Sequence, residues 1–289
     1  MLRIALPNKG RLVEDIRELL ADAGLPIRSA GDRALVASLG GEFEAIFVRA
    51  QDIPEFVADG AADAGITGHD LVRETDRPVL ELFDLELGRC RLVVAARDEG
   101  GARRMDEVPE GARVATAFPR LARRFFEEHG RAVTIVPVTG AAEITPHLGV
   151  ADLIVDLTST GSTLRVHHLR EIETVLTSTA RLITAENGAA MRDEQKRLAL
   201  EGLTTALASV LRARGQRYLM ANVPRAALER VKEVLPGLSG PTVIDILDGG
   251  VFVAVHAVVA QQRVYRTIAE LKALGSEGIL VTRIERLMP

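Results

Sequence analysis

Residues 152–164 read DLIVDLTSTGSTL, an apolar run that ends at an acid and gives way to hydroxyl groups. Leu153, Ile154 and Val155 suit a buried strand. After Asp156, six of the next seven residues are Thr, Ser or Gly, which suit a loop. Ligands bind outside the carboxyl ends of the strands in open α/β sheets. The stretch therefore predicts an α/β fold with a binding loop at the end of a core strand.

The loop after Asp156 has the residue types of a phosphate site. Backbone N–H groups in a tight turn bind phosphate, hydroxyl groups add donors, and Gly161 permits backbone angles that other residues resist. Asp156 is suited to accept hydrogen bonds from a ribose diol. The loop lacks the Gly-Lys-Thr of a Walker motif. The alternative from these residues alone is an ordinary polar loop with a capped helix.

The N-terminal part of the chain alternates short apolar runs with helical spacing. This alternation predicts strands at 2–7, 43–48 and 62–68 and helices at 11–24 and 52–60. Asp52 is a plausible cap of the second helix, which has Pro54 in its first turn. Strands that alternate with helices favour an α/β fold with a mostly parallel sheet.

The pattern restarts at Cys90 and predicts a second α/β lobe. Strands are expected at 90–96, 112–117, 134–138 and 151–157, with a helix at 119–130 and a short helix around 141–149. Residues 171–185 are long and rich in β-branched residues, which suits a strand that returns the chain to the first lobe. The spacing of residues 192–215 predicts an amphipathic helix.

The last 75 residues change rhythm and predict a βαββαβ unit of the ferredoxin-like kind. The expected elements are strands at 218–224, 241–247, 251–259 and 278–287 and helices at 225–237 and 261–275, with a hairpin turn at 248–250. We expect this third domain to begin near Arg214. The predicted domains are 1–90 with 180–213, 91–179, and 214–289.

Composition narrows the function classes. The chain has 289 residues, of which 47% are hydrophobic and 26% charged, the balance of a soluble globular protein. The net charge of −4 and an aromatic content of 3% argue against nucleic acid as a partner. Cys90 is the only cysteine, which excludes an internal disulfide. With no segment like a signal peptide or a membrane span, we expect a cytoplasmic protein.

Several motifs together resemble one enzyme family. GVADLIVDLTSTGSTL (149–164), with Glu143 upstream, resembles the signature of ATP phosphoribosyltransferase. Further resemblances occur in the same order along almost the whole chain: LRIALPNKGRL (2–12), FVRAQDIPEFVADGAADAGITGHDLV (47–72), VATAFPRLARRFF (114–126), QRYLMANVP (216–224) and GLSGPTV (237–243).

The resemblance implies an activity and an architecture. This family joins ATP to 5-phosphoribosyl-1-pyrophosphate (PRPP) with Mg²⁺, through N1 of adenine, and releases pyrophosphate in the first step of histidine biosynthesis. Its catalytic part has two lobes like those of periplasmic solute-binding proteins. A short form needs a partner subunit, whereas the long form adds a C-terminal domain that binds histidine as feedback inhibitor. The βαββαβ tail matches the long form. AMP as a further ligand, homodimers and homohexamers are also implied.

The resemblance also implies site residues. For PRPP these are Glu143, Asp156, Leu157, Thr158, Ser159, Thr160, Gly161, Ser162 and Thr163. For ATP they are Lys9, Gly10, Arg11, Arg49, Asp70 and Phe118. For regulatory histidine they are Asn222, Leu238, Ser239 and Thr242. Some relatives are expected to have an acid near Asn222, so the amide here would bind histidine less electrostatically.

Several of these residues also have a purely structural interpretation. Lys9 and Arg11 suit a polyphosphate but also an ordinary charged surface. Asp70 is placed to cap a helix, and Phe118 is as well suited to the core as to a wall beside adenine. Glu143 is either a second acid near the ribose or a solvated helix residue. His69 is given no role.

The implied chemistry needs no general base, because adenine N1 is already a nucleophile. We therefore assign no catalytic base, and we expect Mg²⁺ to be bound mainly through substrate phosphates. One alternative is a different phosphoribosyltransferase, but that common class has two adjacent acids before its loop, whereas Val155 precedes Asp156 here. The other alternative is a non-catalytic small-molecule-binding or regulatory relative.

Overall fold

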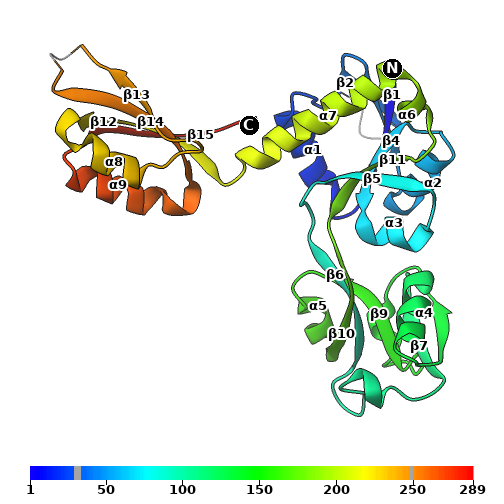
Figure 1. Ribbon diagram of the computed structural model, residues 1–289. Coiled ribbons are helices and arrows are strands. Elements are labelled where there is room, and N and C mark those ends of the chain that lie inside the picture. The colour runs from blue at the N-terminus through cyan, green and yellow to red at the C-terminus, as the bar shows by residue number, and fades with distance from the viewer. Residues whose placement is uncertain (29–33, 248–249, 289) are drawn as a thin grey trace. The chain divides into compact units, whose positions relative to one another are not determined.

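The computed structural model describes residues 1–28, 34–247 and 250–288. These residues form two compact units, Met1–Thr204 and Thr205–Pro289, and the boundary falls inside helix α7 (Glu194–Ala213). Figure 1 shows the elements of each unit. Of the hairpin turn predicted at 248–250, positions 248 and 249 lie outside the described residues.

The first sheet of the N-terminal unit has six strands in the order β2-β3-β1-β4-β11-β5. Their bounds are β1 Leu2–Pro7, β2 Val36–Gly40, β3 Phe43–Val48, β4 Ala64–Gly68, β5 Val79–Asp84 and β11 Ala180–Ala185. β1 lies parallel to β3 and β4, and the other pairs are antiparallel. Because β1 is central and apolar, it is buried along most of its length.

Short helices accompany this sheet: α1 Val13–Asp22, α2 Ile53–Ala58, α3 His69–Thr75 and α6 Ala189–Arg192, with a 3₁₀ turn at Ala50–Asp52. α1 buries Ile16, Leu19 and Leu20, which recur at helical spacing. Asp52 occupies the N-cap position of α2, but its side chain makes no capping hydrogen bond and its backbone is already helical. The predicted capping role of Asp52 is therefore wrong.

The second sheet has five strands in the order β10-β6-β9-β7-β8. The bounds are β6 Cys90–Arg97, β7 Ala112–Thr116, β8 Val133–Pro137, β9 Leu153–Thr158 and β10 Leu169–Ser178. Helices α4 (Pro119–Glu128) and α5 (Ser162–Val166) and 3₁₀ turns at Met105–Glu107 and Ala142–Ile144 complete this lobe. Apolar residues from both faces of β9 form its core, with Val155 on one side and Ile154 on the other.

The prediction of a mostly parallel sheet, made from the N-terminal part of the chain, is wrong, because the first sheet is mixed, and the second sheet is mixed as well. β9 lies parallel to β7 but antiparallel to β6, and β6 lies antiparallel to β10. The cause is connectivity, because β6 and β10 join the two sheets and run in opposite directions. Only the strands linked through helices, such as β1 with β4 and β7 with β9, keep the parallel arrangement.

The chain passes twice between the two sheets. One passage is residues 85–89, between β5 and β6, and the other is Thr179, between β10 and β11. The single strand predicted at 171–185 is thus two strands in different sheets. Two α/β lobes joined by two short passages give the arrangement of periplasmic solute-binding proteins, as the resemblance implies (Figure 1).

The C-terminal unit confirms the predicted ferredoxin-like order. It contains β12 Gln216–Pro224, α8 Leu228–Val234, β13 Thr242–Asp245, β14 Phe252–Ala260, α9 Val264–Ala273 and β15 Glu277–Arg283, with 3₁₀ turns at Arg225–Ala227 and Gln261–Arg263. The sheet order is β13-β14-β12-β15. Val231 of α8 and Leu271 of α9 pack against one face of this sheet, where Val253 and Val255 are buried. In the described part of the chain, no helix is long and apolar enough to cross a bilayer.

Candidate functional site

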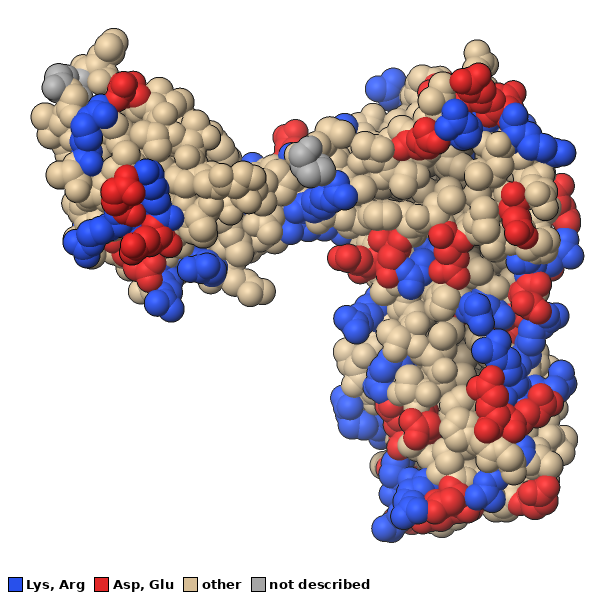
Figure 2. Space-filling model, viewed as in Figure 1, with Lys and Arg blue, Asp and Glu red and all other residues tan. Residues whose placement is uncertain are grey.

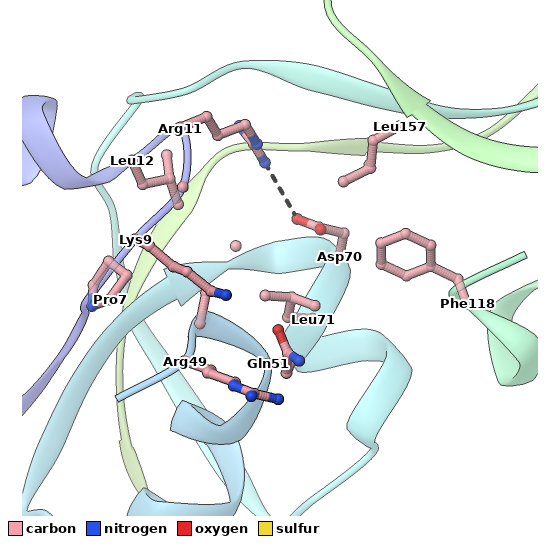
Figure 3. Close-up of a pocket in the computed structure, with 13 residues that line it drawn as sticks. Pro7, Lys9, Arg11, Leu12, Arg49, Gln51, Asp70, Leu71, Phe118 and Leu157 are labelled. Carbon is pink, nitrogen blue, oxygen red and sulfur yellow. Dashed lines mark ion pairs between the residues drawn. The ribbon is translucent and has the colours of Figure 1, made fainter. Parts of the chain in front are cut away.

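A pocket of about 330 Å³ lies between the two lobes of the N-terminal unit. Most of its lining comes from the carboxyl ends of β1, β3 and β4, and the second lobe contributes two side chains (Figure 3). The lining residues are Pro7, Lys9, Gly10, Arg11, Leu12, Arg49, Ala50, Gln51, Gly68, Asp70, Leu71, Phe118 and Leu157. All six residues predicted for the ATP side are in this set, together with Leu157 of the loop predicted for PRPP.

Three cations reach the pocket from two neighbouring strand ends. Lys9 and Arg11 follow β1 and are separated by Gly10, whose φ of 104° favours glycine, while Arg49 follows β3 directly. The guanidinium of Arg11 donates a hydrogen bond to the carbonyl of Gly88, and its Nη2 lies 3.6 Å from Oδ1 of Asp70. The pocket therefore presents positive charge of the kind that a polyphosphate requires.

Asp70 is buried, with 2% of its surface exposed, and it is not the cap of α3. Gly68 occupies the N-cap position instead. The backbone N–H of Asp70 donates to Oγ of Ser178 at 3.1 Å, and the Ser178 hydroxyl donates back to Oδ1 of Asp70. A Cβ at Gly68 would lie 2.2 Å from that Oδ1, so a larger residue at this position would displace the Asp70 carboxylate. Asp70 thus connects the pocket to the end of β10, where the chain passes between the lobes.

The sequence left open whether Phe118 belongs to the core or to the wall of a pocket, and the structure places it in both. It belongs to the core of the second lobe, where 5% of its surface is exposed, and it also lines the pocket. Its backbone N–H donates to Oγ1 of Thr116 at 2.9 Å, and it occupies the N-cap position of α4. Packing in the core of the second lobe holds the ring in place, and the ring forms part of the apolar wall of the pocket.

The hydroxyl loop joins β9 to α5 in a tight turn. Gly161 has a φ of 72° and donates its N–H to Oγ1 of buried Thr158 at 2.9 Å. The Thr160 hydroxyl donates to Oγ of Ser162 at 3.0 Å. Thr158 therefore shapes the turn from inside, whereas the exposed hydroxyl groups belong to Ser159, Thr160, Ser162 and Thr163.

Two acids lie beside this loop. Burial raises the pKa of the Asp156 carboxyl, the negative charge of Glu143 raises it further, and a hydrogen bond from the Leu157 N–H opposes the rise. That N–H donates to Oδ1 at 2.8 Å. Glu143 is half-buried in the 3₁₀ turn at Ala142–Ile144. The protein thus keeps an acid in a partly desolvated position, an arrangement that recurs at functional sites.

The residues predicted for histidine lie in the C-terminal unit. Asn222 is half-buried on β12, and Thr242 begins β13. Asn222 pairs with Ala254 while Thr242 pairs with His256, so both positions belong to the sheet face away from α8 and α9, on either side of β14. Leu238 and Ser239 lie in the turn that leads into β13.

Sequence reasoning did not name several of the lining residues. Gln51 and Leu71 lie within the segment 47–72, two residues after Arg49 and one residue after Asp70, so their positions in the sequence already point to them. Ser178 had no such signal, because it lies 108 residues from its partner Asp70.

The described residues contain no group of three His, Cys, Asp or Glu side chains placed to bind a metal ion. The acids near the loop are two, Asp156 and Glu143. Mg²⁺ is commonly bound by one or two carboxylates together with substrate phosphates and water. This donor set fits Mg²⁺ only when a substrate supplies most of the ligands.

A cationic pocket between two α/β lobes defines a class, that of two-lobed proteins that bind a small anionic molecule between their sheets. Family models then match most of the chain. The ATP phosphoribosyltransferase model matches residues 49–209, and the model described as HisG, C-terminal domain, matches residues 213–286.

Individual relatives agree with the family models. An ATP phosphoribosyltransferase from Gemmatimonas aurantiaca is 67% identical over 292 residues, which cover 100% of both chains. One from Natronomonas pharaonis is 49% identical and also covers 100% of both chains. A solved ATP phosphoribosyl transferase (HisG:HisZ) complex from Thermotoga maritima matches with a TM-score of 0.62 and 29% identity, over 72% of this chain and 99% of that chain.

The chain belongs to the ATP phosphoribosyltransferase family. It is a pentosyltransferase that transfers the phosphoribosyl group of PRPP to ATP, the first step of histidine biosynthesis.

Proposed function

We propose that the two substrates divide the cleft between them. ATP takes the pocket of Lys9, Gly10, Arg11, Arg49, Asp70 and Phe118, and PRPP takes the loop from Asp156 to Thr163 with Glu143 beside it. The observation that carries this proposal is that Leu157, which lies between Asp156 and Thr158 at the end of β9 and directly before the hydroxyl loop, also lines the pocket. The two substrates would therefore meet at the junction of pocket and loop.

Within this arrangement the loop amides and the exposed hydroxyl groups of Thr160 and Thr163 bind the 5-phosphate. Asp156 accepts hydrogen bonds from the ribose hydroxyl groups, and its partial burial strengthens them because competing water is reduced. Thr158 contributes through the shape of the turn, since its hydroxyl already accepts from Gly161.

The reaction attaches adenine N1 to C1 of the ribose, with inversion, while pyrophosphate leaves. Adenine N1 has a lone pair ready, so the protein's contribution is orientation and charge complementarity. Asp156 and Glu143 stabilise the developing positive charge on the ribosyl centre, and Lys9, Arg11 and Arg49 bind phosphates. Phe118 provides an apolar wall that excludes water on the adenine side.

Mg²⁺ is the cofactor that we propose, since phosphoribosyltransferases generally use it. When bound, it neutralises charge on the pyrophosphate that departs. Asp156 and Glu143 are the two carboxylates placed to support it, directly or through water, and substrate phosphates supply the remaining ligands.

We further propose that residues 214–289 sense histidine and make a separate partner unnecessary. The Thermotoga maritima structure is a complex of two proteins, and its matched chain aligns with 72% of this one. This chain has a C-terminal unit of its own that matches the HisG C-terminal family model. Residues 1–90 with 180–213 and 91–179 would be the two catalytic lobes. Homodimers and homohexamers in the cytoplasm, with AMP as a second nucleotide ligand, complete the proposal.

The double variant Thr160→Val/Thr163→Val tests the division of the cleft. Each substitution keeps the side-chain shape and removes a donor, so the KM for PRPP should rise by roughly tenfold or more while the KM for ATP changes little. Initial rates with each substrate varied in turn give both constants. Ser159→Ala in the same loop is the milder control. An unchanged KM for PRPP in a folded double variant would refute the phosphate-loop assignment.

A further inference from the structure

The first turn of α4 is hydrogen-bonded by a carboxylate from the other lobe. The leading N–H groups of a helix have no acceptor within the helix. In α4, the N–H of Arg120 donates to Oε1 of Glu74 and the N–H of Leu121 donates to Oε2, both at 2.9 Å. Glu74 belongs to α3 in the first lobe, and α4 belongs to the second lobe. One side chain therefore satisfies two backbone donors across the cleft.

A second contact joins α3 to the first turn of α4, and we call this contact region between the two helices the seam. The guanidinium of Arg120 lies 2.7 Å from Oδ2 of Asp76, the C-cap residue that directly follows α3. Figure 2 shows Lys and Arg side chains gathered where α3 faces α4, and Arg73, Arg120, Arg123 and Arg124 line a cavity of about 370 Å³ there. A carboxylate accepts hydrogen bonds through both of its oxygens, as the Glu74 side chain does here.

Helix α3 connects this seam to the pocket and to the passage between the lobes. Asp70, four residues before Glu74, makes the buried hydrogen bonds with Ser178 and faces Arg11. At the other end of the seam, Phe118 directly precedes Pro119 and lines the pocket. A carboxylate that fixes the first turn of α4 therefore also fixes Phe118 against the pocket.

We propose that Glu74 is a positioning residue that keeps the two lobes closed over the substrate pocket, with Asp76 as its auxiliary. We name Glu74, Asp76 and the first turn of α4 the α3–α4 latch. The inference goes beyond the assignment of substrates and rests on it in one respect, that the pocket is where substrate binds. Removing the latch lowers the population of the closed form, and apparent affinity falls in proportion to that population.

Hydrogen exchange measures the latch directly. The amides of Arg120 and Leu121 have no intrahelical acceptor, so Glu74 is the source of their protection. In the ligand-free enzyme these two amides should exchange slowly, and in Glu74→Ala they should exchange faster by about tenfold. Glu74→Gln keeps one acceptor oxygen, so it should give an intermediate rate. Glu127→Ala, an exposed glutamate on α4, is the control and should change neither amide.

Kinetics measure the consequence. Glu74→Ala should raise the KM for the substrates by about three- to tenfold and leave kcat within about twofold, because saturating substrate restores closure. Asp76→Asn should act in the same direction to a smaller extent, since Asn tolerates the positive φ of 53° at this position. KM should be lowest in the wild type, intermediate in Glu74→Gln and highest in Glu74→Ala, in the same order as the exchange rates of the two amides. A merely structural role would not link KM to the exchange of these two amides.

Each outcome decides the proposal. Unchanged exchange at Arg120 and Leu121 in Glu74→Ala overturns it, and so does faster exchange with an unchanged KM, or a fall in kcat alone. If Glu74→Ala does not fold, Glu74→Gln and Asp76→Asn supply the same comparison. The substrate assignment fails separately, through Thr160→Val/Thr163→Val, and in that case the exchange result still measures the latch.

Discussion

At the scale of single residues, two acids at opposite ends of one apolar run have opposite environments. Asp152 and Asp156 frame Leu153, Ile154 and Val155. Hydrogen bonds from the Arg113 side chain and backbone lower the pKa of Asp152. Burial raises the pKa of Asp156. Ionised Asp152 thus stabilises the folded state, whereas ionised Asp156 destabilises it. An unfavourable carboxylate of this kind is expected where the side chain serves a ligand.

Asp156→Asn should lower activity and raise stability at neutral pH. The folded state makes ionisation of Asp156 harder, so the charged form penalises folding above the ordinary Asp pKa, and the penalty vanishes as pH falls below it. The amide removes that penalty and also the charge that we propose acts on the ribose, so the rate should fall by about 10- to 100-fold. Thermal melting between pH 4 and 7, together with initial rates, measures both effects.

Asp152→Asn is the matched control with the opposite sign. The folded-state pKa of Asp152 is lowered, so its contribution to stability is present above the ordinary Asp pKa and is lost as pH falls. The melting temperature at neutral pH should therefore decrease in Asp152→Asn, while the kinetics for PRPP stay near wild type. A lower melting temperature in Asp156→Asn at pH 7 would contradict the account of the buried acid.

Local sequence predicted features that depend on neighbouring residues, and it did not predict contacts between positions far apart along the chain. The strand, the turn at Gly161 and the cations after β1 and β3 follow from neighbouring residues, and Lys9, Arg11 and Arg49 all line one pocket. The pairings of Asp70 with Ser178 and of Glu74 with α4 join positions far apart, so no local pattern contained them.

At the scale of elements, the sequence did not predict β2 and β5 of the first sheet, although it did predict the exposed strands β13 and β15. β5 (VLELFD) is half-exposed and β2 (VASLG) alternates over only five residues, so neither has a strong pattern. The break at Thr179 was also hidden, because both β10 and β11 are rich in β-branched residues. The larger error concerned the relative direction of the strands. β6, β10 and β11 pair antiparallel with their neighbours because the chain passes between the lobes at these strands.

Gly65→Ala should destabilise the first lobe by about 1–3 kcal/mol, because an added Cβ overpacks the contact between β4 and α2. That Cβ would lie 2.5 Å from Cγ2 of Ile53 and 2.9 Å from Cγ2 of Val57. Both methyl groups are on β-branched side chains that cannot rotate away at low cost. Thermal melting tests this, with Gly202→Ala in α7 as control.

Gly202 is exposed, and a Cβ added there would meet no other part of the described chain within 4 Å beyond the backbone of its own helix. Alanine at this position should therefore be neutral or should stabilise the helix by up to about 1 kcal/mol. A Gly65→Ala variant that melts at or above the wild-type temperature would show that β4 and α2 are packed less tightly than the contacts indicate.

At the scale of the whole molecule, the chain combines a catalytic unit with a ferredoxin-like unit. The order βαββαβ was readable from the last 75 residues because each element is short and its apolar spacing is regular. The ligand of that unit was not readable from spacing, because Asn222, Ser239 and Thr242 are common in ordinary loops and sheet faces. The combination predicts an enzyme that works without a separate regulatory protein.

The most direct test is the rate at which the purified chain alone forms phosphoribosyl-ATP from ATP, PRPP and Mg²⁺, with pyrophosphatase present, with and without histidine. We expect turnover in the absence of any other protein, inhibition of the full chain by histidine, and loss of that inhibition when residues 214–289 are deleted. Failure of the purified, folded chain to form product under these conditions, or a full-length rate indifferent to histidine, would contradict the account.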